Sequence, residues 1–200
     1  MALRRDARDN RARLLVAARE VFAESGATSP LELVARRAGV GRGTLYRNFP
    51  DRSALLAALF EERLGLLEDL VAAYDGDDVL ERLLVEICWY EVVVPGLGAL
   101  LPTGADEEPP GDGLQRVSTA TQHLIDVALR RSLEAGAVRP DLTVSDALLV
   151  IAMVHGAVAS AGADASRDVV HRALGIALDG IRPDGRVGAD VPRPGLPDRA

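Results

Sequence analysis

The stretch ARRAGVGRGTLYRNF, residues 35–49, decides the fold of the first part of the chain. It holds four arginines, three glycines and one tyrosine, and its small apolar residues keep a helical spacing. Ala35 and Ala38 continue the apolar face of one helix, Gly39 ends that helix, and Leu45 is the inward residue of a second, short helix. A helix, a turn that contains glycine and a second helix form the arrangement that lets the second helix enter a DNA major groove.

The side chains left outside on the short second helix suit contact with DNA. Guanidinium, hydroxyl and amide groups, with a glycine that permits close approach, favour contact with base edges and phosphates over packing in a core. These outward residues are Arg42, Gly43, Thr44, Tyr46, Arg47 and Asn48. An ordinary helical hairpin with a polar outer face is the alternative that the spacing alone leaves open.

Two further helices flank this motif. The apolar residues of residues 10–25 recur at intervals of three and four, which predicts an amphipathic helix that ends at Gly26. Ser29-Pro30-Leu31-Glu32 has the spacing of a capping box, so we expect the next helix to begin at Ser29. After the motif, Asp51 can cap a long helix that runs to about Tyr74.

The charge of the chain is divided unequally. Residues 1–50 hold ten arginines and five acids, whereas residues 51–200 hold thirteen arginines and twenty-five acids, for a net charge of -7. A basic module attached to an acidic one favours a polyanion-binding head, although a solvated basic helix face gives the same count. The N-terminal arginines form either an arm that reaches DNA or a solvated tail.

Composition restricts the remaining possibilities. The chain of 200 residues is 48% apolar and only 4% aromatic, and its apolar residues are mainly leucine, valine and alanine, which predicts an all-α protein. A single cysteine, Cys88, and three scattered histidines predict neither a disulfide nor a metal site, and we expect no cofactor. We also expect a cytoplasmic protein, because no segment looks long and apolar enough for a membrane helix.

Residues 10–60 resemble the N-terminal DNA-binding domain of TetR-family transcriptional regulators. The resemblance rests on AREVFAESGATSPLELVARRAGVGRGTLYRNFPDRSALLAALF, residues 18–60, and covers about a quarter of the chain. It implies an all-α homodimer whose third helix reads the major groove of an operator. It also implies a variable C-terminal domain that binds a small molecule, which releases the protein from DNA.

The resemblance also implies roles for individual residues. Arg42, Gly43 and Thr44 would approach bases, Tyr46 and Asn48 would hold phosphates, and Arg47 could do either. Ser29 and Arg52 would each face a phosphate. Gly41 and Asn48 depart from the serine and histidine that the family often has at these positions, but both substitutions keep the cap or a donor.

The remainder, residues 51–181, is predicted to be a helical ligand-binding and dimerisation domain after the DNA-binding domain at residues 1–50. Helices are expected at residues 78–94, 114–135, 143–161 and 166–181, with a mobile pocket cover at residues 95–113 and a disordered tail at 182–200. The ligand is expected to be small and apolar. The predicted pocket residues are Arg63, Leu67, Leu70, Tyr74, Trp89, Tyr90, Leu101 and Ile125, although Arg63 also fits a structural ion pair.

The helix predicted at residues 143–161 is apolar nearly all round, so it must be covered on both sides. A second copy of the chain is the simplest cover, with the last two helices pairing as a four-helix bundle. The predicted dimer contacts are Ile151, His155, Val158, Val170, Leu174 and Leu178.

Two other classes of function remain as alternatives. A DNA-organising protein without an effector would share the basic head but would bind many sequences equally. A small all-helical enzyme is disfavoured, because neither a phosphate-binding glycine loop nor a nucleophile elbow occurs in the sequence.

Overall fold

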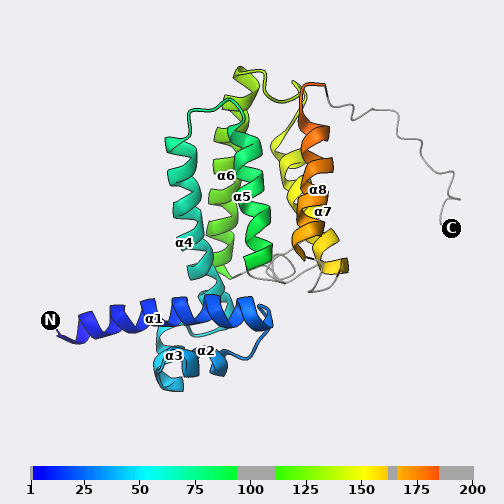
Figure 1. The fold of residues 1–200 in the computed structure, drawn as a ribbon. Helices are drawn as coiled ribbons and strands as arrows, with labels where there is room; N and C mark the ends of the chain where they lie inside the picture. Colours follow the sequence, from blue (N-terminus) through cyan, green and yellow to red (C-terminus); the bar gives the residue numbers. More distant parts are fainter. Residues whose placement is uncertain (1, 94–110, 162–165, 185–200) are drawn as a thin grey trace, which may run out of the picture.

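The computed structural model describes residues 2–93, 111–161 and 166–184, and the regular elements in those residues are all α-helices. The predicted all-α fold is confirmed. The helices are α1 (Ala2–Ser25), α2 (Leu31–Arg37), α3 (Arg42–Asn48), α4 (Arg52–Ala73), α5 (Val79–Val93), α6 (Asp112–Glu134), α7 (Val144–Ala161) and α8 (Ser166–Ile181). We call α1–α3 with the first turns of α4 the head, and the rest of α4 with α5–α8 the body (Figure 1).

The first helix is longer than predicted. It begins at Ala2 rather than at residue 10, so the arginine-rich N-terminus continues α1 as a helix. Contact of its arginines with DNA stays a prediction. Alanine, leucine and arginine are strong helix formers, and Asp6 and Asp9 lie near the N-terminal end, where the helix dipole favours negative charge.

The predicted capping box at Ser29 is wrong. Helix α2 begins at Leu31 after Pro30, and no side chain caps it. The Ser29 hydroxyl instead donates toward the carbonyl oxygens of Ser25 and Gly26, at 2.8 and 2.7 Å. The hydroxyl thus gives the Ser25 carbonyl, at the end of α1, a partner that the helix itself does not supply. The Gly26 carbonyl also accepts the Ser29 amide, at 3.1 Å.

The head has its own apolar core. Phe22 of α1, Val34 of α2, Leu45 of α3 and Phe49 are at most 1% exposed. The core continues into α4, where residues 55–59 pack in the same cluster, past the domain boundary predicted at residue 50. Asp51 caps α4 as predicted, since its carboxylate accepts a hydrogen bond from the Ala54 amide at 2.7 Å.

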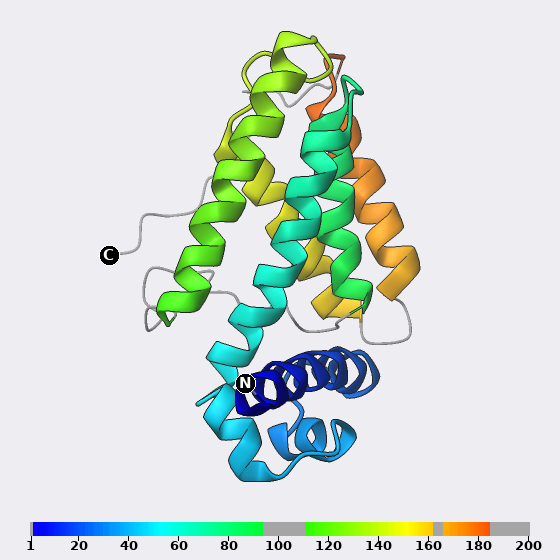
Figure 2. The same ribbon diagram turned by 90° about the vertical axis from the view of Figure 1, so that its left-hand side faces the viewer.

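Helices α4 and α6 connect the body to the head. Helix α4 runs from the head up into the body, and α6 lies beside it (Figure 2). A Cβ atom at Gly113, in the first turn of α6, would lie 2.8 Å from the Cβ of Ala57, so glycine is needed for this close approach. Leu114 of α6 completes the head core.

Helix α7 corrects a sequence prediction. Within the described residues, it is the one helix long and apolar enough to cross a membrane by length and composition, contrary to our expectation that no such segment exists. Four of its side chains, at Ala147, Val150, Val154 and Val158, are nevertheless buried in the body. Helix α7 therefore packs one face against the body and leaves apolar side chains exposed on another.

The end of the body is tied down further than predicted. The tail was expected to begin at residue 182, but Arg182 donates to both carboxylate oxygens of Glu81, at 2.9 and 3.0 Å. Residues 185–200 of the predicted tail lie outside the described residues, as do residues 95–110 of the predicted pocket cover.

Candidate nucleic-acid interface

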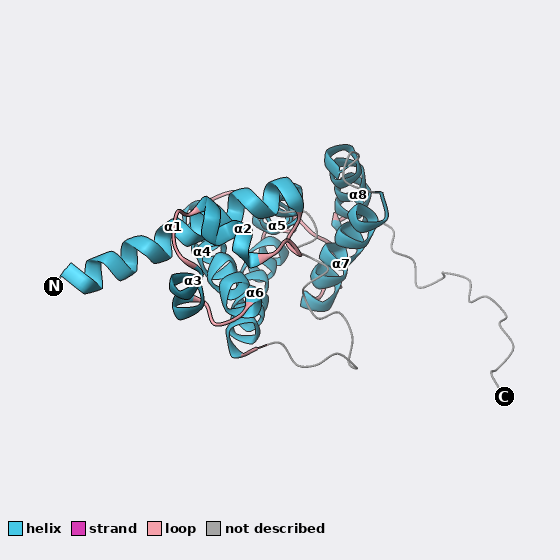
Figure 3. Cartoon of the chain, turned by 90° about the horizontal axis from the view of Figure 1, so that it is seen from below, coloured by secondary structure: helices cyan, strands magenta, loops and turns pink. Residues whose placement is uncertain are grey.

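The turn between α2 and α3 depends on Gly39. Gly39 has a φ of +65°, a conformation that L side chains rarely adopt, and a Cβ atom there would lie 2.9 Å from the Arg13 guanidinium. The Val40 amide donates to the Ala35 carbonyl at 3.0 Å and closes the turn. The predicted helix-turn-helix is present, and α2 and α3 lie on the side of α1 that faces away from the body (Figures 1 and 3).

Helix α3 turns one apolar side chain inward and its polar side chains outward. Leu45 is fully buried, whereas Arg42, Gly43, Tyr46 and Arg47 are exposed. A Cβ atom at Gly43 would meet nothing within 4 Å, so packing within the chain does not require glycine there. The exposed face of α3 is therefore free of steric cover from its own domain.

Thr44 and Asn48 are half-buried and help to fix this face. The Asn48 side-chain amide donates to the Thr44 carbonyl at 2.8 Å, and Arg47 Nη2 donates to Thr44 Oγ1 at 3.0 Å. The structure thus brings together the six residues predicted on α3. Their contacts with bases and phosphates stay predictions.

Glu32 of α2 belongs to the same surface and was not predicted as a site residue. Its Oε1 oxygen lies 2.9 Å from Arg42 Nη2 and accepts a hydrogen bond from the Tyr46 hydroxyl at 3.4 Å. One feature of the sequence could have indicated this role, because Glu32 is the one acid between residues 25 and 50. Its spacing from Ser29 assigned Glu32 to a capping box, and we therefore did not consider it as a site residue.

Two predicted phosphate contacts are occupied by the protein itself. Ser29 is buried and points toward the carbonyls of the α1 end, as described above. Arg52 donates to the carbonyls of Ala27 and Ser29, at 2.5 and 2.6 Å, and lies over the Phe22 ring. Contact of either side chain with DNA stays a prediction that requires it to share or exchange these partners.

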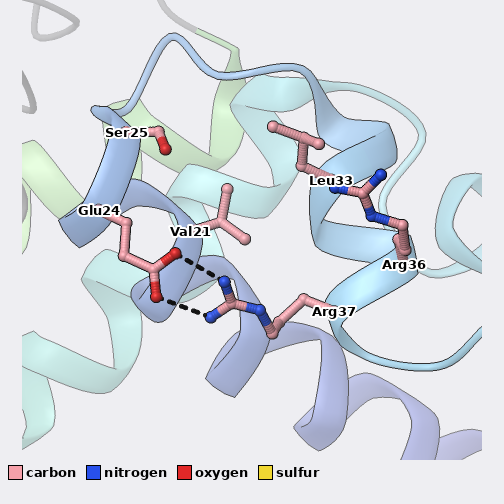
Figure 4. Close-up of a pocket in the computed structure, with 6 residues that line it drawn as sticks. All are labelled: Val21, Glu24, Ser25, Leu33, Arg36 and Arg37. Atoms are coloured by element: carbon pink, nitrogen blue, oxygen red, sulfur yellow. Dashed lines mark hydrogen bonds and ion pairs between the residues drawn. The ribbon is translucent and has the colours of Figure 1, made fainter.

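Other arginines of the head also serve its structure. Arg11 stacks over the Phe49 ring, with 4.5 Å between Cζ and the ring centroid, and Arg13 donates to the Ala38 carbonyl at 2.5 Å. Arg37 forms two hydrogen bonds with Glu24, at 3.0 and 2.6 Å, across a shallow hollow of about 400 Å³ between α1 and α2 (Figure 4). The hydrogen bond from Arg37 lowers the pKa of the Glu24 carboxyl.

Arg63 of α4 is held at the junction of the head and the body. It donates to the backbone carbonyl of Glu86 at 2.7 Å and pairs with the Glu86 carboxylate at 3.0 Å, which fits the predicted structural ion pair. Its guanidinium lies 5.1 Å from the Tyr90 ring centroid, and burial raises the pKa of the Tyr90 hydroxyl. Arg63 Nε is buried without a hydrogen-bond partner, the one such side-chain atom in the described residues.

The other predicted pocket residues are distributed over different parts of the molecule. Leu67 and Ile125 are buried in the body core, and Leu70 and Tyr74 pack against that core. Trp89 packs against a separate cluster formed by α5, α7 and α8, whereas Tyr90 packs against the head core. Leu101 lies outside the described residues, so the predicted pocket as a whole stays a prediction.

A second hollow, of about 370 Å³, lies where the head meets α6. Its lining includes Asn48, Asp51 and Ala57 from the head side and Gly111 and Arg116 from the α6 side. The two hollows are thus in the head and at its junction with α6, and neither is lined by the residues predicted to bind a ligand.

The predicted dimer contacts stay a prediction, although most of them are covered within one chain. Val158, Val170, Leu174 and Leu178 are buried within a single chain, because their stripes face α5 and the body core rather than solvent. Ile151 and His155 are half-buried. The large apolar side chains that α7 and α8 leave exposed are instead Leu149, Met153 and Ile176, at 56%, 51% and 63% exposure.

Comparison with known proteins identifies the family. Residues 14–59 match the profile described as "Bacterial regulatory proteins, tetR family", and residues 76–183 match the profile "Transcriptional regulator SbtR-like, C-terminal domain". The chain belongs to the TetR family of transcriptional regulators. Proteins of this family are regulators rather than enzymes, and the helix-turn-helix described above lies within the matched N-terminal domain.

Relatives of known structure support this family throughout the described fold. A TetR transcriptional regulator from Streptomyces coelicolor is 32% identical, with a TM-score of 0.56, over 88% of this chain and 99% of that one. A TetR transcription regulatory protein from Mycobacterium vanbaalenii is 29% identical, with a TM-score of 0.60, over 90% and 99% of the two chains.

The similarity to curated relatives covers a smaller part of the chain. An HTH-type transcriptional regulator from Staphylococcus aureus is 35% identical over 65 residues, which are 32% of this chain and 35% of the relative. The match therefore spans about a third of that relative's length. The functions of its remaining part do not transfer to the body described here.

Proposed function

We propose that this TetR-family regulator is a homodimeric, cytoplasmic repressor that binds a two-fold symmetric operator and is released by a small, largely apolar effector. The observation that carries the proposal is the exposed face of α3. Its polar side chains surround one buried anchor, Leu45, and its glycine at position 43 is open to close approach. Such a face suits insertion into a major groove.

The homodimer is supported by the exposed apolar side chains of α7 and α8. Leu149 and Met153 are four residues apart on α7, so they lie on one face of that helix, and Ile176 is exposed on the adjoining α8. These helices form one side of the body (Figures 1 and 3). Packing of two such sides would cover the apolar residues and would place two α3 helices on one duplex.

The effector is supported by Arg63 and by structural relatives that hold ligands. The buried Nε of Arg63 lacks an acceptor, and Tyr90 offers an apolar ring beside it. Among structural neighbours, a Bacillus subtilis FadR was solved in complex with stearoyl-CoA, at 20% identity and a TM-score of 0.61, and SmeT was solved with triclosan, at 23% and 0.55. These identities support a shared fold, and an effector for this chain is our extension of it.

Helix α4 is the proposed connection between effector and DNA. Its residues 55–59 lie in the head core, and Leu67 and Val71 lie in the body core. A ligand that displaced α4 in the body would therefore move the head with it. In a dimer, such movement would change the distance between two α3 helices, which must stay about one duplex turn apart.

Selection of DNA from a random pool by the purified full-length chain tests this proposal. Enrichment of an inverted repeat is the expected result, and searching the source genome for it would indicate target genes. Binding that is salt-sensitive but enriches no sequence would overturn the proposal in favour of a DNA-organising protein.

A further inference from the structure

Glu32 is an acid in a surface that otherwise attracts DNA. Residues 25–50 contain four arginines and this one carboxylate. Its Oε1 oxygen contacts both Arg42 Nη2, at 2.9 Å, and the Tyr46 hydroxyl, at 3.4 Å. The Arg42 guanidinium also lies over the Tyr46 ring, with 5.6 Å between Cζ and the ring centroid. One oxygen atom of α2 therefore holds two exposed side chains of α3 that are one helical turn apart.

Stability of the fold does not account for this arrangement. The side chains of Arg42 and Glu32 are 70% and 46% exposed, and an ion pair so open to water contributes about 1 kcal/mol at most. A carboxylate at this position also repels the phosphates of any duplex that α3 approaches. Glu32 also lies in the first turn of α2, where the helix dipole favours a carboxylate, but that role does not require its contacts with Arg42 and Tyr46. Those contacts bear on how α3 meets DNA.

We propose that Glu32 determines the specificity of α3 by withholding Arg42 from phosphates. The Arg42–Glu32 pair has no net charge as a unit, so its attraction for a DNA backbone of arbitrary sequence is weaker than that of an unpaired Arg42. The pair opens when a base edge accepts two hydrogen bonds from the guanidinium, a contact that discriminates between bases by about 1–3 kcal/mol. The proposal rests on the proposed function, because it requires that α3 reads sequence.

Tyr46 makes the arrangement directional. Its hydroxyl shares the Glu32 oxygen and its ring lies beneath the Arg42 guanidinium, so both side chains are oriented before DNA arrives. Release of Arg42 from Glu32 therefore has the same cost on any sequence. Two hydrogen bonds to a matching base edge offset that cost, whereas contact with the backbone of an unrelated sequence offsets less of it.

The variant Glu32→Gln tests the proposal, because glutamine keeps the length and an acceptor oxygen but removes the charge. Affinities of the full-length chain are measured for the selected operator and for a scrambled duplex over a range of salt concentrations. We expect scrambled-duplex affinity to rise about fivefold and its salt slope to steepen by about one counterion. Operator affinity should change by less than about twofold, so the specificity ratio should fall.

A matched control separates position from net charge. Glu20→Gln removes one negative charge from the same domain, at a residue that pairs with Arg37 at 3.1 Å while Arg37 keeps its two bonds to Glu24. We expect its scrambled-duplex affinity to rise less than half as much as that of Glu32→Gln. Equal rises in the two variants would overturn the proposal.

Two further results would also overturn it. Equal weakening of operator and scrambled binding by Glu32→Gln, with a lowered unfolding midpoint, would assign Glu32 a purely structural role. Persistence of the full effect of Glu32→Gln in an Arg42→Ala background would show that Glu32 does not act through Arg42.

Failure of the proposed function has a different signature. Wild-type protein would then bind operator candidates and scrambled duplex alike. The salt slopes of Glu32→Gln and Glu20→Gln on scrambled duplex would still decide whether Glu32 neutralises Arg42, since that comparison needs no operator.

Discussion

The head and the body differ in which side chains they use internally and which they leave exposed. In the head, four arginine side chains stabilise the fold by contacting backbone carbonyls, aromatic rings and carboxylates. These arginines are Arg11, Arg13, Arg37 and Arg52. In the body, aliphatic side chains fill the core between five helices. The head thus has more positive charge than its fold uses, and the body has more apolar surface than its core uses.

This difference indicates where partners bind. On α3, Arg47 leaves its positive charge exposed and Arg42 is exposed but paired with Glu32. The exposed apolar side chains of Leu149, Met153 and Ile176 lie on α7 and α8. Exposed positive charge attracts anions, and exposed apolar surface favours association with another protein surface. We expect a DNA duplex to contact the charged face of α3 and a second copy of the chain to cover the apolar side chains of α7 and α8.

The largest effect is expected from Leu45→Ala, which removes the single inward anchor of α3. Leu45 is fully buried in the head core, so the loss should cost about 2–5 kcal/mol of head stability. We expect an early unfolding transition in urea, followed by circular dichroism, and a matching loss of operator binding.

The exposed Val16 of the same domain provides the control for this change. Val16→Ala should alter the free energy of unfolding by less than about 0.5 kcal/mol. An unchanged midpoint for Leu45→Ala would mean that the head does not depend on the α3 anchor.

The next largest effect should follow from Ile176→Glu on α8. A carboxylate is harmless at this exposed position in one chain, but it would be buried without a partner between two copies. The dimer dissociation constant should rise about thirtyfold or more, which corresponds to about 2 kcal/mol. Sedimentation velocity measures it, with Leu66→Glu at a similarly exposed position of α4 as the control. A dimer of wild-type affinity would exclude this face.

A smaller effect is expected from Arg47→Ala, which tests the charge left on α3. Loss of a base or phosphate contact should weaken operator binding by about tenfold to a hundredfold without changing the unfolding midpoint. Fluorescence anisotropy with labelled operator measures the affinity, and Arg130→Ala on α6 should leave it unchanged. If both Arg47→Ala and Tyr46→Ala bind as wild type does, α3 is not the reading helix.

The sequence predicts the helices of this protein well because their signals are local. Gly39 and Leu45 occupy the positions that the apolar spacing assigns to them, and α8 has the predicted bounds. Apolar periodicity and glycine depend on a few neighbouring residues, so no knowledge of tertiary contacts is needed.

Partners distant in the sequence explain what was missed. Nothing local indicates that Arg52 reaches back to Ala27, 25 residues earlier, or that Glu32 reaches forward to Arg42. Helix α7 shows a related limit of sequence-based prediction. The spacing of apolar residues such as Val154 and Val158 indicates that they are covered, but it does not indicate whether the same chain or a second copy covers them. Guanidinium groups are especially uninformative, because the same group suits a phosphate, a carbonyl or a ring.

The smallest effect, from Arg52→Lys, tests directly whether an arginine of the head serves the fold or the DNA. Lysine keeps the charge but lacks the planar fork that reaches the carbonyls of Ala27 and Ser29 together. If the structural role dominates, the head should lose about 1 kcal/mol of stability while the salt slope of operator binding stays unchanged. Arg19→Lys is the control, because the partner that the described residues give Arg19 is the exposed Glu62 carboxylate, at 3.1 Å, which an ammonium group can also bind. Unchanged stability with weakened operator binding would instead place Arg52 among the DNA contacts. Arg52 would then leave the set of arginines that hold the fold of the head, and the contrast drawn above between head and body would be weaker.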